Sequence, residues 1–109
     1  MAYDEALASR VREVAGQSAV VSERKMFGGL CFMVEGNMAC GVVGDELMLR
    51  VGPAAHAAAL ARPGARPMDF TGRPMKGMVY VGAEAIATDA DLAAWLGLGL
   101  AFAHSLPPQ

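Results

Sequence analysis

The sequence contains few charged residues, few aromatic residues and only 2 cysteines among its 109 residues. Its 9 Lys and Arg residues are outnumbered by 11 Asp and Glu residues, which gives a formal net charge of -2 at pH 7. Nucleic-acid binding depends on an excess of basic residues on at least one face, so we expect no direct binding to nucleic acid. A hydrophobic fraction of 54% excludes a disordered chain. The length fits a single domain over residues 1–109.

Signals for export and for membrane insertion are also lacking. Residues 1–10 include acidic residues where a signal peptide has a basic region, and no apolar core follows them. The uncharged stretch at residues 92–103 is shorter than the roughly 20 apolar residues that span a bilayer. We therefore expect a cytoplasmic protein that does not insert into membranes.

Hydrophobic periodicity and turn residues predict an α+β domain. The predicted order is helix 3–17, strands 24–35, 38–43 and 46–51, helix 54–61, strands 68–70 and 77–81, and helix 89–106. Gly28 and Gly29 interrupt the first strand, which indicates a bulge, a bend or a close backbone approach. Short connections make the sheet mainly antiparallel. The order therefore predicts a two-layer domain, α-β(3)-α-β(2)-α, with helices on one face of a five-stranded sheet.

The 2 cysteines, Cys31 and Cys40, are predicted to be free thiols. We expect a two-residue hairpin loop at Gly36-Asn37, because a type II′ turn prefers glycine first. This register places Met33 opposite Cys40, and Cys31 then lies diagonal to Cys40 on one face at roughly 7–8 Å. A disulfide needs Cα atoms about 4.4–6.8 Å apart. Two free thiols agree with a reducing compartment.

Both faces of the predicted sheet are apolar, although one face of a two-layer domain is usually polar. The first face is a normal core face and carries Phe32, Val34, Ala39, Val43, Leu47, Leu49 and Val51. The second face is rich in methionine and carries Cys31, Met33, Met38, Cys40, Val42, Met48 and Arg50, with Met78 and Tyr80 as its extension.

Flexible thioether side chains suit adaptable binding surfaces, and a large exposed apolar patch usually marks an interaction site. We therefore predict a partner-binding surface formed by Met33, Met38, Cys40, Met48 and Tyr80. The alternative is a meander that bends at its glycines and buries both faces within the chain. The last helix favours self-association, because its apolar residues surround it and a small domain has little interior to cover them. A homodimer is therefore the expected protein partner.

Basic residues form two pairs beside glycines, Arg24 with Lys25 and Arg73 with Lys76. If the sheet brings these loops together, their cations and backbone N–H groups form an anion-binding site. The alternative is an ordinary charged rim that keeps the protein soluble.

Catalytic and metal-binding patterns are missing. The cysteines lie among apolar strand residues, where the pKa of a thiol rises, so packed thiols are favoured over nucleophiles. The sequence has no Cys-x-x-Cys, no His-Glu-x-x-His and no glycine-rich phosphate loop. We expect no enzyme activity, no cofactor and no metal.

Three short motifs together carry a family resemblance: residues 26–29 (MFGG), residues 36–38 (GNM), and residues 66–68 (RPM) followed by Lys76-Gly77. From about Tyr3 to Pro107 the chain closely resembles the N-terminal domain of the TfoX/Sxy family. The resemblance implies an α-β(3)-α-β(2)-α fold similar to that of type III secretion chaperones. It also implies a link to regulators of natural competence that act with the cyclic-AMP receptor protein. It supplies no catalytic residues.

The sequence therefore predicts a small regulatory protein–protein interaction module, linked to transcription or competence. The alternative is a binder of a small anionic ligand, or an enzyme of unknown reaction, that uses the loops at Arg24/Lys25 and Arg73/Lys76.

Overall fold

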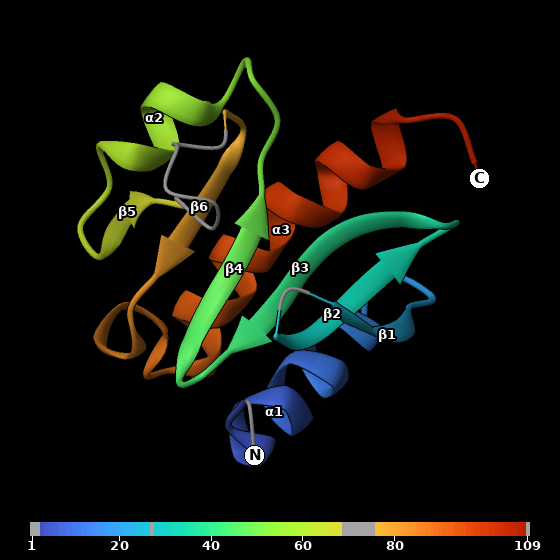
Figure 1. Cartoon of the computed structure of the whole chain (residues 1–109), viewed down its shortest axis with the longest axis horizontal. Coiled ribbons are helices and arrows are strands. Elements are labelled where there is room, and N and C mark those ends of the chain that lie inside the picture. Colours follow the sequence, from blue (N-terminus) through green and yellow to red (C-terminus); the bar gives the residue numbers. More distant parts are fainter. Residues whose placement is uncertain (1–2, 27, 69–75, 109) are drawn as a thin grey trace.

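The structure is a computed structural model that describes residues 3–26, 28–68 and 76–108 (Figure 1). Within these residues one antiparallel sheet has the strand order β1-β2-β3-β4-β6-β5 and packs against helices. The elements along the chain are α1 (Glu5–Gly16), β1 (Ser22–Met26), β2 (Gly29–Val34), β3 (Asn37–Val43), β4 (Glu46–Arg50), α2 (His56–Leu60), β5 (Ala65–Pro67), β6 (Met78–Val81), the 3-10 helix η1 (Ala83–Ile86) and α3 (Asp89–Ser105).

The described residues form six strands, whereas five were predicted, because the segment 24–35 is a hairpin and not one strand. Gly28 has a φ of 74° and lies in the turn, where a residue with a Cβ is strained. A Cβ on Gly29 would lie 2.1 Å from the carbonyl oxygen of Val42, so this glycine allows the neighbouring strand to approach. The strand predicted at 68–70 is β5 at Ala65–Pro67. Residues 69 and 70 lie outside the described residues.

The predicted register of the β2–β3 hairpin is wrong. Val34 pairs with Asn37, so the loop is Glu35-Gly36 and not Gly36-Asn37. Glu35 and Gly36 have φ values of 51° and 84°, as a type I′ turn requires of both loop residues. Asn37 is therefore a strand residue, and its buried side-chain Nδ2 donates to the carbonyl of Pro107 at 2.9 Å.

A bulge between Phe32 and Met33 then shifts the pairing by one residue, so that Cys40 lies opposite Phe32. Cys40 and Val42 pack in the core beneath the helices, and not on the methionine-rich face as predicted. Val43 was predicted on the core face but packs on the other one. A bulge changes the face of the residues beyond it, because side chains alternate along a strand.

We call the side of the sheet covered by α1 and α3 the helix face. Its core is aliphatic, and α1 contributes Leu7, Ala8, Val11 and Ala15 to it. From the sheet it includes Leu30, Phe32, Val34, Ala39, Cys40, Val42, Leu47, Leu49, Val51, Val79 and Val81.

The last helix is buried by the chain itself. Gly99 faces β3, where a Cβ would lie 2.4 Å from the carbonyl oxygen of Ala39, so the glycine allows close packing. Leu100 is buried and Leu98 is half-buried against the same core. Among the described residues, Val20 is the only exposed large hydrophobic side chain. The chain itself therefore buries the apolar residues around α3, and their burial does not require a second copy of the chain.

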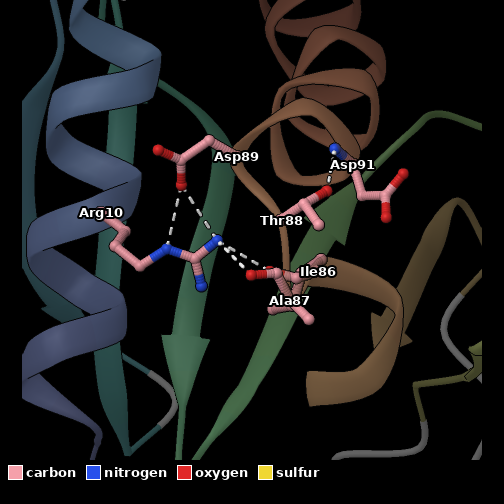
Figure 2. Close-up of polar contacts among 6 residues, drawn as sticks. All are labelled: Arg10, Ile86, Ala87, Thr88, Asp89 and Asp91. Atoms are coloured by element: carbon pink, nitrogen blue, oxygen red, sulfur yellow. Dashed lines mark hydrogen bonds and ion pairs between the residues drawn. The ribbon is translucent and has the colours of Figure 1, made fainter.

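One arginine joins the two long helices (Figure 2). Arg10 in α1 donates to the carbonyl of Ile86 at 2.9 Å and to Asp89 Oδ1 at 3.1 Å. Thr88 caps α3, and its Oγ1 accepts from the N–H of Asp91 at 3.1 Å. This contact places the start of α3 beside α1.

No helix in the part of the chain that the structure describes is long and apolar enough to cross a membrane.

The other side of the sheet carries a second core, which we call the methionine cluster. Its buried members are Cys31, Met33, Met38, Met48, Met68 and Met78, with Met26, Val43 and Tyr80 half-buried against them. The sequence correctly placed Met33, Met38, Met48 and Met78 opposite the helices. Their expected exposure was wrong, since Met48 is fully buried and Met33 and Met38 are each 8% exposed. The alternative of a meander that buries both faces is therefore the one observed.

The sheet is curved, so that distant strands approach one another on this side. Met26 in β1 and Met78 in β6 line one cavity, although three strands lie between theirs. A flat sheet would separate strands at those positions by about 19 Å, at about 4.8 Å for each strand spacing. Figure 1 shows β3 curving strongly along its length. Gly41 leaves room inside the curve, because a Cβ there would lie 2.6 Å from the terminal methyl of Met48.

The two cysteines are buried free thiols, as predicted, although for a different geometric reason. Cys31 belongs to the methionine cluster and Cys40 to the helix face, so the sheet separates them. Burial raises the pKa of Cys31 to about 11. Burial, with a smaller effect of Cys31, raises the pKa of Cys40 to about 12. Neither thiol is poised as a nucleophile.

Candidate functional site

The sheet opens where β3 and β4 stop pairing. Their ladder extends only to the pair Cys40–Leu49, after which β3 stays with β2 and β4 continues beside β6 (Figure 1). At this end of the methionine cluster lies a cavity of about 550 Å³, within the usual size range of small-molecule sites. We call it the splay cavity. Its described lining residues are Met26, Met38, Arg50, Gly52, Pro53, Lys76, Gly77, Met78 and Phe102.

Two glycines with left-handed backbone form one rim of the splay cavity. Gly52 has a φ of 85° and Gly77 a φ of 88°. A Cβ on Gly52 would lie 2.4 Å from ring atoms of Phe102, so the ring packs directly against this backbone. The carbonyl of Gly77 accepts from the N–H of Val51 at 2.8 Å and of Gly52 at 3.1 Å. The N–H of Gly77 donates to Nδ1 of His56 at 2.7 Å. These bonds hold the rim in place.

Two cations line the splay cavity. Arg50 is the last residue of β4, and its guanidinium carbon lies 5.2 Å from the ring centroid of Phe102, which is a cation–π contact. Lys76 is exposed beside Gly77. Neither cation makes an ion pair with a described residue, since the ion pairs there belong to Arg10, Arg12 and Arg66. The site therefore combines positive charge with an apolar wall.

The described lining of the splay cavity consists of apolar side chains, two glycines and two cations. No carboxylate, hydroxyl, amide or thiol side chain is present among the described lining residues. A general base or a nucleophile needs such a group within hydrogen-bond reach of the substrate. The described residues also include no group of three His, Cys, Asp or Glu side chains that could hold a metal ion.

Of the predicted anion-binding residues that the structure describes, only Lys76 lines the splay cavity. Arg24 and Lys25 lie in β1 and not in a loop, and their alternation places them on opposite faces of that exposed strand. Lys76 lines the splay cavity. Arg73 lies outside the described residues. The predicted site therefore contributes one observed member, Lys76.

The predicted partner-binding residues meet in the methionine cluster, except Cys40. Met38 also reaches the splay cavity, whereas Met33 and Met48 are inner members of the cluster. Tyr80 is half-buried at its edge, where the guanidinium of Arg66 lies 4.8 Å from its ring centroid. The burial of the methionines removes the exposed surface from which partner binding was inferred. Homodimer formation stays a prediction.

Sequence reasoning missed Arg50 and Phe102 as site residues. It placed Arg50 on the methionine-rich face, two positions before the sequence Gly52-Pro53 that was predicted to end the sheet. That position could have indicated a site residue, because a lone cation at the end of an apolar strand lies at the rim of the sheet. Phe102 gave no signal, since its place depends on how α3 crosses the end of β4.

A second cavity, of about 230 Å³, lies beside α1 and carries charged residues. Two of its three described charged residues, Asp4 and Arg10, already have roles in the fold. Asp4 caps α1 by accepting from the N–H groups of Ala6 and Leu7, and Arg10 pairs with Asp89. The splay cavity is therefore the better candidate site.

Fold and cavity together define a small α+β domain with a basic and apolar cavity at one end of a curled sheet. The family model for the TfoX N-terminal domain matches residues 13–103. The chain therefore belongs to the TfoX N-terminal domain family, which is associated with competence regulation. A search of curated proteins found no match. A search of solved structures found none either.

Proposed function

We propose that this TfoX N-terminal domain is a regulatory binding module that recognises a negatively charged group in the splay cavity. The observation that carries the proposal is the pair Arg50 and Lys76, two cations without a carboxylate among the described lining residues. An anion between them gains charge-assisted hydrogen bonds, which are stronger in a partly water-excluded site than in bulk water.

The fold supports a role in binding more than a role in chemistry. The rim at Gly52 and Gly77 is fixed by backbone hydrogen bonds, so the site is largely formed before a ligand arrives. A module of this kind regulates by changing its surface or stability when the ligand binds. Protein partners, including a second copy of the chain, would use a surface other than the buried methionines.

The test compares two variants that each lose two positive charges. Arg50→Gln with Lys76→Gln removes the cations of the splay cavity, and Arg24→Gln with Lys25→Gln removes exposed cations of β1. Butyrate and methyl phosphate are titrated into ¹⁵N-labelled protein at constant ionic strength, and the amide signals of Gly52 and Gly77 are followed. We expect saturable shifts in the wild type and in the β1 variant, and none in the cavity variant.

Equal shifts in both variants would show that the cavity cations do not bind the anion, and the proposal would be lost. Loss of the shifts in the β1 variant alone would place the anion site at Arg24 and Lys25, one of the two basic pairs in the alternative that the sequence offered.

A further inference from the structure

The wall of the splay cavity is almost wholly apolar, and this restricts the class of ligand further than the two cations do. Three thioethers, from Met26, Met38 and Met78, form this wall together with the ring of Phe102. A nucleoside or sugar needs donors and acceptors around its body, and the described lining side chains offer none besides the two cations. The body of a matching ligand is therefore apolar, and its charge is at one end.

From this lining we infer that the splay cavity binds an amphipathic anion, a molecule with one terminal carboxylate or phosphate and an unbranched apolar tail. The head lies between Arg50 and Lys76, and the tail lies along the methionine wall. This inference rests on the proposed function and names the ligand class of the same site.

The size of the cavity limits the length of the tail. A volume of about 550 Å³ corresponds to roughly eighteen water-sized groups, at about 30 Å³ for each. A chain of eight to twelve carbons with its head group fits within that volume. Unbranched thioether side chains also adapt to a flexible tail, since they have three rotatable bonds and a polarizable sulfur.

The wall comes from strands that are far apart in the sheet order. Met26 belongs to β1, Met38 to β3 and Met78 to β6, so the curl of the sheet builds the wall. Met26 is half-buried and belongs to the edge of the methionine cluster. A change at Met26 is therefore expected to alter the wall with less damage to the core than a change at Met78.

The experiment measures affinity against tail length by calorimetry and by the same amide shifts. The ligands are butyrate, hexanoate, octanoate and decanoate, with octyl phosphate as the second head group and octanamide as the neutral control. We expect affinity to rise roughly fourfold for each methylene that enters the cavity. We expect octanamide to bind at least tenfold more weakly than octanoate. The ratio of the affinity for octyl phosphate to the affinity for octanoate shows which of the two head groups the cavity prefers.

Two variants of Met26 test the wall itself. Met26→Ser is expected to reduce the gain per methylene, and Met26→Leu is expected to retain it. Thermal unfolding of each variant shows whether it is folded.

The outcomes separate this inference from the proposed function. If butyrate and octanoate bind equally well, and both need Arg50 and Lys76, the module binds anions but the amphipathic ligand is wrong. If none of these anions gives saturable binding, the proposed function itself is wrong. A third result, tighter binding of N-acetyl-leucyl-leucine than of octanoate, would overturn the small-molecule ligand in favour of a protein C-terminus.

Discussion

Met48 and Leu49 are neighbours on β4, and both are fully buried, yet they belong to different cores. Leu49 packs beneath α3 in a core of aliphatic side chains. Met48 packs among other methionines inside the curl of the sheet. The helix face is covered by α1 and α3, whereas the methionine cluster gathers side chains from strands that the curved sheet brings together.

The difference between the two faces shows why the candidate site lies on one and not on the other. A helix laid across a sheet fills the space between them at close packing density. A sheet that curls on itself leaves space where two strands diverge, and here β3 and β4 do so beyond Cys40 and Leu49. Flexible thioethers line that space without having to fill it.

The largest expected change in the free energy of unfolding comes from a charge placed in the methionine cluster. Met48→Lys buries an ammonium group with no partner among apolar side chains, and we expect loss of cooperative folding or a cost of more than about 4 kcal/mol. Val20→Lys is the control, since Val20 is 92% exposed, and it should change the free energy of unfolding by less than about 0.5 kcal/mol. Urea unfolding measures both. A stable Met48→Lys protein would mean that the methionine face is open to water.

The next largest expected change in stability comes from replacing glycine in α3, where Gly99 and Gly97 should respond differently. Gly99→Ala brings a Cβ to 2.4 Å from the carbonyl oxygen of Ala39, so we expect a cost of about 1–3 kcal/mol. Gly97 has no such neighbour within 4 Å and is exposed. We expect Gly97→Ala to stabilise the protein by about 0.5–1 kcal/mol, because alanine is the better helix former. Thermal unfolding of the two variants should therefore shift in opposite directions.

The alkaline pH dependence tests the burial of one thiol on each face. Because burial raises the pKa of Cys31 and Cys40, their stabilising effect is complete below the ordinary thiol pKa and is lost as the pH rises above it. Above about pH 9 the free energy of unfolding should fall by about 1.4 kcal/mol per pH unit for each thiol. The Cys31→Ala/Cys40→Ala variant should lack this part of the slope. Identical slopes in the two proteins would show that the thiols are exposed.

The smallest expected effect concerns two exposed ion pairs. Arg12 of α1 pairs with Glu23 of β1, and Arg66 of β5 pairs with Glu46 of β4. We expect double-mutant cycles to give coupling energies of about 0.2–1 kcal/mol, because such pairs are largely solvated. Hydrogen bonds from the arginines lower the pKa of both carboxyl groups, so the coupling is present at neutral pH and is lost as the carboxyls protonate in acid. A coupling that persists at pH 2 would contradict this account.

Local signals predicted much of the fold correctly. Apolar spacing predicted both long helices. Alternation placed Met33, Met48 and Tyr80 opposite the helices. The errors arose where one residue changes the register, at the loop Glu35-Gly36 and at the bulge after Phe32. No local rule distinguishes a II′ loop at residues 36–37 from a I′ loop one residue earlier.

The candidate site was harder to predict than the fold. The sequence grouped Lys76 with Arg73 and with the β1 cations, on the assumption that the sheet brings these loops together. Its observed partner in the splay cavity is Arg50, which lies 26 positions earlier on the strand next to β6. Only the strand order brings the two cations to one rim.

The sequence by itself determined the family, the order of most elements and the presence of two apolar faces, because these follow from residue type and periodicity within short segments. Only the tertiary structure decided that the second face is closed, since closure depends on the sum of small twists over six strands and on glycines that permit close approach. The same curvature determined where space remains for a ligand.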